Sequence, residues 1–159
     1  MPAIAPRRAR RMKLTDYTDY SLRVLIYVAV HPDEPVTIQR IADAYRLPKN
    51  HLIKIVQRLG QLGYLRTMRG RAGGIRLGRP AQEINVAEVV KAMEPDFHMV
   101  ECFHADNRCI ITPACGLRGA LHEALAAYFD VLAQYSLQDL LPPSPQAYQL
   151  LSRIDVTTS

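Results

Sequence analysis

The sequence predicts a mainly α-helical protein with a small β-hairpin wing, namely a winged helix-turn-helix followed by a long dimerisation helix. Three observations support this fold class. Short amphipathic segments in the first half lead into a glycine- and arginine-rich hairpin, apolar residues recur at heptad spacing in the second half, and the two halves differ in charge. Apolar residues make up 48% of the 159 residues, which is typical of a globular chain.

The first half begins with three predicted helices. Apolar residues recur at helical spacing over residues 16–31, and Thr37 is a good N-cap for a second helix over residues 38–45. Pro48 suits the first position of a third helix that reaches about Leu59. The apolar positions of each segment fall on one face, and we expect those faces to be turned inward.

A β-hairpin is predicted after the third helix. Residues 64–68 and 75–77 are expected to form two strands, and the turn over residues 69–74 is rich in glycine, which permits positive φ and close backbone approach. Two short helices, a third helix with a polar exposed face and this hairpin together make a winged helix-turn-helix over residues 12–80.

The second half is predicted to hold a short helix over residues 86–93 with Asn85 as its cap, an irregular segment over residues 94–114, and a helix of about 19 residues from Leu117. Two interleaved heptad seams run along that last helix: Leu117, Leu121, Ala124, Leu125, Tyr128, Val131, Leu132 and Tyr135. So broad an apolar face requires a partner, and we expect a two-fold homodimer.

The charge of the chain is divided between its halves. Residues 1–80 carry sixteen Lys and Arg against five Asp and Glu, a net charge of +11, whereas residues 81–159 carry four against ten, a net charge of −6. A basic half joined to an acidic half is typical of a polyanion-binding module, and with the predicted fold it indicates double-stranded DNA.

The expected DNA contacts lie on the third helix and on the hairpin. In a helix-turn-helix the start of the second helix of the motif enters the major groove, where Asn can bond adenine and Lys can bond guanine or phosphate. The residues at these positions are Lys49, Asn50, His51 and Lys54 on the helix and Arg69 and Arg71 on the turn of the hairpin. We expect the two arginines to enter a minor groove, and Arg76 and Arg79 to hold phosphates.

Three cysteines, Cys102, Cys109 and Cys115, lie within fourteen residues, and the chain has no others. Three thiols cannot all pair as disulfides within one chain, and a chain without a signal peptide is expected in a reducing compartment. Clustered thiols there are more plausibly ligands of zinc or of an iron–sulfur centre. The cluster therefore predicts a metal or redox site.

Other interpretations of the cysteines stay open at this point. A zinc site would need a fourth ligand from His98, His104 or His122, although the sequence has no CxxC pair. A metal-free thiol switch would use the first two cysteines. An enzyme with Cys115 as nucleophile is disfavoured because no glycine turn or oxyanion-hole signature flanks it, so we expect no enzymatic activity.

Four segments together resemble a known family: LTDYTDYSLRVLIYVA, NHLIKIVQRLGQLGYL, RGRAGGIRLG and ITPACGL. Over about residues 12–141 the chain resembles the nitric-oxide-sensitive repressors of the Rrf winged-helix family of iron–sulfur regulators. The resemblance implies a homodimer that binds an inverted-repeat operator while its cluster is intact. Nitrosylation of the cluster by nitric oxide would then release the operator; oxygen, peroxide or iron status is the alternative signal.

The resemblance also implies a ligand set. The three cysteines match the family's three cluster ligands, and Asp19 matches the aspartate that supplies the fourth ligand of a [4Fe–4S] centre from the other subunit; Asp16 is a neighbouring acid. A related branch, the regulators of iron–sulfur assembly, has a histidine where this chain has Arg118, which cannot ligate. A [4Fe–4S] cluster is therefore favoured, and [2Fe–2S] is the alternative.

We expect four parts in the chain. Residues 1–11 form a disordered basic arm, residues 12–80 the winged helix-turn-helix, residues 81–141 a cluster-binding loop with the dimerisation helix, and residues 142–159 a flexible tail. The start lacks the apolar region of a secretory signal, and no apolar run approaches the ~20 residues that a membrane span needs. We therefore expect a cytoplasmic protein without membrane contact.

Overall fold

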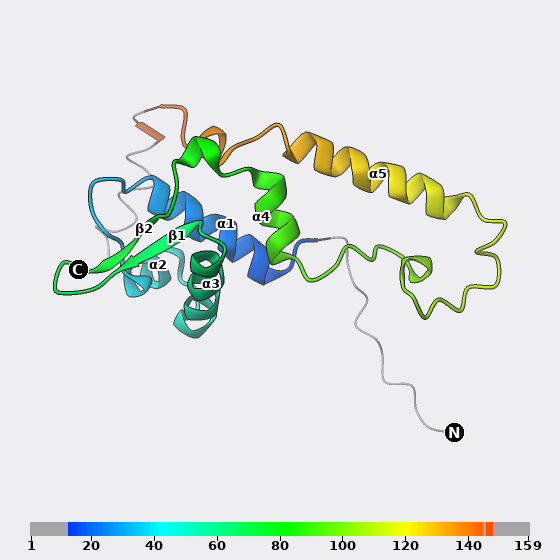
Figure 1. Ribbon diagram of the computed structural model, residues 1–159, viewed down its shortest axis with the longest axis horizontal. Coiled ribbons are helices and arrows are strands. Elements are labelled where there is room, and N and C mark those ends of the chain that lie inside the picture. The colour runs from blue at the N-terminus through cyan, green and yellow to red at the C-terminus, as the bar shows by residue number, and fades with distance from the viewer. Residues whose placement is uncertain (1–12, 145, 148–159) are drawn as a thin grey trace, which may run out of the picture.

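A computed structural model describes residues 13–144 and 146–147. A body of four helices and a two-stranded hairpin carries a long extension, which consists of an irregular segment and the last helix (Figure 1). The fold is the predicted winged helix-turn-helix with a further helix. The predicted arm over residues 1–11 lies outside the described residues, as does most of the tail over residues 142–159.

Helix α1 (Asp16–Ala29) begins at Thr15, whose side chain accepts a hydrogen bond from the backbone N–H of Thr18. The helix ends two residues earlier than the sequence suggests, with Val30 as its C-cap. Pro32 follows shortly after, and the residue before a proline avoids the helical region. One face of α1 is buried along its whole length, which makes it the central helix of the body.

Helices α2 (Ile38–Tyr45) and α3 (Lys49–Gln61) form the helix-turn-helix. Thr37 caps α2 as predicted, and α2 ends at Arg46, which has a left-handed backbone with φ of 54°. Pro48 is the N-cap of α3 rather than its first helical residue; its extended ψ of 121° places it just outside the helix. The turn between the helices is therefore short.

Strands β1 (Leu65–Met68) and β2 (Gly74–Leu77) form the antiparallel wing, with Leu65 opposite Leu77. Val36, which precedes α2, adds a bridge to Ile75, with backbone N–O distances of 2.9 and 2.7 Å. A Cβ at Gly74 would lie 2.9 Å from the carbonyl oxygen of Val36, so this close approach of the backbones requires glycine. The bridge fixes the wing to the body.

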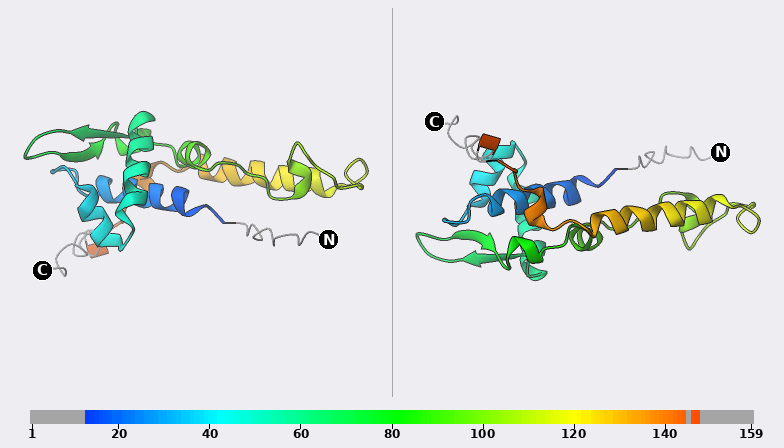
Figure 2. Two further views of the ribbon diagram at one scale, coloured as in Figure 1. Left: turned by 90° about the horizontal axis from the view of Figure 1, so that it is seen from below. Right: turned by 90° about the horizontal axis from the view of Figure 1, so that it is seen from above.

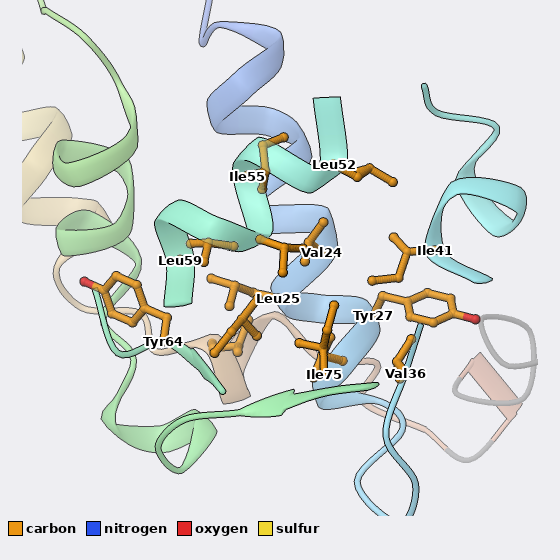
Figure 3. Packing of buried hydrophobic residues seen from close by; sticks show 14 of the residues in the cluster. Val24, Leu25, Tyr27, Val36, Ile41, Leu52, Ile55, Leu59, Tyr64 and Ile75 are labelled. Atoms are coloured by element: carbon orange, nitrogen blue, oxygen red, sulfur yellow. The ribbon is translucent and has the colours of Figure 1, made fainter. Parts of the chain in front are cut away.

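The core lies between α1, α3 and the hairpin (Figure 3). Its buried side chains come from every element of the body: Val24 and Leu25 of α1, Ile41 of α2, Leu52, Ile55 and Leu59 of α3, Leu65 of β1, Ile75 of β2, and Val89 of α4 (Val86–Met93). Burial of one such side chain stabilises the fold by about 1.5–3 kcal/mol before the entropy of ordering it is counted. This core sets the position of α3 relative to α1.

Helix α4 (Val86–Met93) begins at Asn85 as predicted, and the Asn85 side chain accepts from the backbone N–H of Ala87 at 3.0 Å. It ends at Glu94, whose ψ is 132°. The next residue is Pro95, and a residue that precedes proline avoids the helical region. The chain therefore leaves α4 in an extended direction.

Helix α5 (Leu117–Leu132) has 16 residues and is shorter than predicted. The residues that follow α5 are bonded to the start of α4. The Asn85 side chain donates to the carbonyl of Ala133 at 2.8 Å, and the backbone N–H of Val86 donates to the carbonyl of Tyr135 at 3.0 Å. The described residues also include three short 3-10 helices: Ala81–Glu83, Glu101–Phe103 and Leu137–Leu140.

The extension differs from the body in its burial. None of residues 94–136 is buried, and α5 projects away from the core in all views (Figure 2). Its exposed apolar side chains include Leu117, Tyr128, Val131 and Tyr135. Within the part of the chain that the structure describes, no helix combines the length and the apolar character that crossing a membrane demands.

Candidate DNA-binding surface and cysteine site

The predicted reading residues share one exposed surface on α3. Lys49, Asn50, His51 and Lys54 are all exposed at the start of the helix. Beneath them Leu52 and Ile55 are fully buried against α1, so the exposed face has a fixed orientation relative to the body. Basic and amide side chains on a rigid helix are the groups that contact base edges and phosphates in a major groove.

Ile53 is a residue of this surface that the sequence analysis missed. Its side chain is 43% exposed, although it lies beside the buried Leu52 in sequence. The helical period already places residue 53 off the buried stripe, and that is the signal by which it could have been found. An apolar side chain among the polar reading residues is suited to contact the methyl group of a thymine.

The wing carries the predicted arginines at its tip. Arg69 and Arg71 are exposed in the turn between β1 and β2. Gly70 lies between them with φ of 105°, a conformation that L-residues rarely adopt. A Cβ at Gly73 would lie 2.6 Å from the carbonyl oxygen of Met68, so the tight turn also depends on this glycine. The tip is thus a narrow basic loop with side chains free of the core.

Arg76 and Arg79, for which phosphate contacts are expected, bond to the body in the structure. Arg76 donates to the carbonyl oxygens of Pro32 and Asp33 at 2.6 and 3.0 Å. Arg79 donates to the carbonyl of Leu62 at 3.1 Å, and its guanidinium lies 4.9 Å from the centre of the Tyr64 ring. Both arginines therefore brace the wing against the body; the sequence alone cannot separate such arginines from phosphate-binding ones.

A hollow of about 190 Å³ lies between α1 and the start of α3. Its lining residues are Asp16, Tyr17, Tyr20, His51, Lys54 and Ile55. The hydroxyl of Tyr17 donates to the carbonyl of Lys54 at 3.5 Å, which links the two helices across it. The first turns of α1 are therefore in contact with α3.

Each cysteine is positioned by local structure. Cys102 lies in the 3-10 turn Glu101–Phe103. The N–H of Cys109 donates to the Asn107 side chain at 2.9 Å, in a turn that the Thr112 hydroxyl also joins. Cys115 comes just before the first turn of α5, where unpaired N–H groups favour negative charge. All three thiols are free and partly exposed.

The structure does not bring the predicted ligands together. Among residues 13–144 and 146–147, no group of three or more His, Cys, Asp or Glu is arranged to hold a metal ion. The donor set nevertheless fits an iron–sulfur cluster in kind, because three free thiols lie on one short segment without a buried residue. Such a segment can converge on a cluster without breaking a core.

The histidines that could complete a zinc site are engaged with rings of the extension. His98 and His104 face one another with ring centres 4.2 Å apart, and His122 of α5 stacks on Phe103 at 4.1 Å. Further along, the Phe97 ring meets that of Phe129 edge to face at 4.7 Å. The cysteine segment, residues 94–116, thus runs back along α5.

Asp19 is partly exposed on the first turns of α1, with 42% of its side chain accessible. Its carboxylate accepts from Nε and Nη2 of Arg23 at 3.2 and 2.7 Å, one turn later on the same helix. Asp16, the neighbouring acid, lies 3.8 Å from Lys13. The Asp19 carboxylate is therefore accessible from outside the body while its orientation is held by one arginine.

Glu94 is a second group that the sequence analysis missed. Its carboxylate accepts from the backbone N–H of Thr15 at 3.1 Å, from the Thr15 hydroxyl at 3.1 Å and from the hydroxyl of the buried Thr18. These contacts join the first residue of the cysteine segment to the N-cap of α1. A separation of 79 residues in sequence hides this contact from any local pattern.

Comparison with known proteins gives a consistent result. The Rrf2 family, described as iron-dependent transcriptional regulators, matches residues 14–143. The HTH-type transcriptional regulator NsrR of Bacillus licheniformis is 53% identical over 143 residues, which cover 89% of this chain and 100% of that protein. NsrR of Bacillus subtilis is 54% identical over 142 residues, which cover 88% of this chain and 97% of that protein.

Solved structures show the same fold at lower identity. CymR, described as the global cysteine regulator of B. subtilis, matches with a TM-score of 0.67 at 23% identity, over 82% of this chain and 96% of that one. IscR of T. potens matches with a TM-score of 0.66 at 20% identity, over 81% of this chain and 85% of that one. Likeness at this level of identity concerns the fold alone.

Proposed function

The chain belongs to the Rrf2 family of transcriptional regulators, and we propose that it is a repressor that senses nitric oxide through an iron–sulfur cluster. It is a DNA-binding transcriptional regulator rather than an enzyme. The proposal has three parts: a homodimer that binds an inverted-repeat operator, a cluster held by the cysteine segment, and loss of operator binding when nitric oxide attacks the cluster.

The operator contacts proposed for each protomer are those of α3 and the wing. Lys49, Asn50, His51 and Lys54 would face the major groove, and Arg69 and Arg71 would enter the flanking minor groove. Exposure of all six side chains on two adjoining elements supports this assignment. Two protomers related by a two-fold axis would read two half-sites in opposite directions, which is why the operator is proposed to be an inverted repeat.

The single observation that carries the sensing proposal is the set of three free, partly exposed thiols on a segment without buried residues. Cys102, Cys109 and Cys115 would hold the cluster, and Asp19 of the second protomer would supply an oxygen ligand. The bound cluster would supply the chemistry of the sensor, since iron–sulfur centres react with nitric oxide. A [4Fe–4S] centre is favoured because this ligand set leaves one iron without a thiolate.

The homodimer is proposed from the exposed face of α5. Leu117, Tyr128, Val131 and Tyr135 are each more than a third exposed although their side chains are large and apolar. A second copy of α5 would cover them from water, and a two-fold pair is the commonest way to do so. The same pairing would allow Asp19 of one protomer to approach the cysteine segment of the other.

The proposal is tested by a visible absorption spectrum of protein purified without oxygen, recorded together with operator binding during stepwise addition of nitric oxide. We expect a broad band near ~400 nm, as for cysteine-ligated clusters, that bleaches in step with loss of operator binding. A colourless protein that still binds the operator would contradict the cluster and favour zinc or bare thiols. Bleaching by oxygen or peroxide, with nitric oxide inert, would assign the sensor to those signals instead.

A further inference from the structure

We propose that Glu94 is a positioning residue that couples the cysteine segment to the DNA-reading helix, by holding the start of α1 in place. The inference rests on the proposed function, because that function makes the segment the sensor. It adds a specific route inside one chain by which a change at the cysteines reaches α3. The route consists of Glu94, the first turn of α1, and the contact of α1 with α3.

The first step is the set of hydrogen bonds by which Glu94 holds the start of α1. The two carboxylate oxygens accept three donors, the N–H and hydroxyl of Thr15 and the hydroxyl of Thr18, with Thr15 N at 3.1 and 3.3 Å from them. A carboxylate at this place also faces the positive end of the α1 dipole. Thr18 is fully buried, and a buried hydroxyl that loses its hydrogen-bond partner costs more free energy than an exposed hydroxyl, which can bond to water.

The second step is the location of Glu94 in the chain. It ends α4, and Pro95 forces the following backbone to extend into the cysteine segment. Helix α4, which ends at this residue, contacts α5. On α5, burial raises the pKa of Tyr128, and the negative charge of Glu94 raises it further. The cysteine segment therefore begins at the end of a helix that contacts both α1 and α5.

The third step carries the effect to DNA. Asp19 lies one turn after Thr15 on α1, and the hydroxyl of Tyr17 reaches the carbonyl of Lys54 on the reading helix. Tyr17 and Tyr20, at the start of α1, pack against the same core that the buried face of α3 helps to form, so a shift of this part of α1 would disturb the position of α3. A segment that pulls Glu94 would thus alter the orientation of the reading residues.

The test uses two variants and one matched control. Glu94→Gln keeps the shape but leaves one acceptor oxygen for three donors, and Thr18→Val removes a donor and leaves an apolar side chain in a buried place. Glu88→Gln is the control, because Glu88 lies on the same helix, is exposed and loses the same charge. If one of the two variants fails to fold, the exchange measurement on the other still tests the inference.

The first measurement is hydrogen exchange of the metal-free protein without DNA. We expect peptides that cover residues 13–20 to exchange about tenfold faster in Glu94→Gln and Thr18→Val, with no change in Glu88→Gln. Unchanged exchange in both variants would overturn the inference, because Glu94 would then not hold the start of α1. This measurement does not depend on a cluster, so it judges the contact even if the proposed function fails.

The second measurement is the ratio of operator affinities of cluster-loaded and metal-free protein. We expect the ratio to fall about tenfold toward one in Glu94→Gln, while the control keeps the wild-type ratio. A residue with a merely structural role would lower stability and leave this ratio unchanged, which would overturn the inference. A wild-type ratio of one would instead remove the proposed function, and the coupling with it.

Discussion

The body and the extension of this protein are folded by different means. In the body, helices α1 and α3 bury Leu25, Leu52 and Leu59 completely, and the wing is bridged to the same core. In the extension, no residue between 94 and 136 is buried, and the contacts are ring pairs and turns on one side of α5. The body has a complete core within a single chain, whereas the extension leaves apolar side chains exposed to solvent.

This difference suits the two roles proposed for the chain, DNA recognition and sensing. A packed core resists small displacements, which a DNA-reading helix requires. A segment with few buried contacts opens at low cost in free energy, and such segments are the ones that change in switches. We therefore propose that the body recognises DNA, and that the sensor lies in the extension, which a second copy and a cluster would complete.

The largest expected effect comes from a cavity in the body. Leu52→Ala should lower the free energy of unfolding by about 2–5 kcal/mol, because it removes a fully buried side chain at the seam of α1 and α3. Denaturant unfolding followed by circular dichroism measures it. A decrease below ~1 kcal/mol would mean that this part of the core is not tightly packed.

The adjacent residue provides the matched control. Ile53→Ala removes a similar side chain that is 43% exposed, so stability should change by no more than about 0.5 kcal/mol. Operator affinity should fall nevertheless, and substitution of single thymines by uracil should show which thymine methyl group the isoleucine touches. Equal effects of uracil in wild type and variant at every position would exclude Ile53 from base recognition.

A charge on α5 should separate the protomers. Val131→Asp places a carboxylate on the exposed apolar face, and we expect the dimer dissociation constant to rise at least about tenfold in sedimentation experiments. Ala126→Asp adds the same charge on the opposite side of the helix and should leave the dimer intact. If both variants or neither dissociated, the apolar face of α5 would not be the dimer interface.

A smaller effect is expected at the wing. Arg71→Ala should weaken operator binding and reduce the slope of log K against log salt concentration by about 0.9 for each phosphate that the arginine neutralises. Binding titrations at several salt concentrations measure both quantities. Arg76→Ala, by contrast, should destabilise the wing because it removes the bonds to Pro32 and Asp33. An unchanged slope in Arg71→Ala would remove the wing tip from the DNA-binding surface.

The body was largely predictable because its determinants are local. Thr37 and Asn85 were recognised as N-caps from residue type and the apolar pattern that follows, and both caps are confirmed. Pro48 was placed one position too far into its helix, a distinction that depends on ψ. Helix α5 ends earlier than its heptads suggest because the carbonyls of Ala133 and Tyr135 are taken by α4, which is a tertiary effect.

The site was predictable in composition but not in geometry. The exposure of Lys49, Asn50, His51 and Lys54 follows from helical periodicity. Arg76, by contrast, bonds to carbonyls more than 40 residues away in sequence. Glu94 was not predicted because an acid after a helix end is ordinarily solvated, and its partners Thr15 and Thr18 are 79 and 76 residues away in sequence. The convergence of the cysteines stays a prediction, since it would depend on a second copy and on a cluster.

The most direct test of the account is a mixed dimer of an Asp19→Ala chain and a Cys109→Ser chain, purified without oxygen through two different tags. If Asp19 serves the cysteines of the other protomer, one of the two sites is complete, and the mixed dimer should hold half the iron and half the visible absorbance of wild type. Each variant alone should hold no stable cluster. A mixed dimer without a cluster would contradict a sensor built across two chains, and a stable cluster in the Asp19→Ala homodimer would leave Asp19 as a partner of Arg23 only.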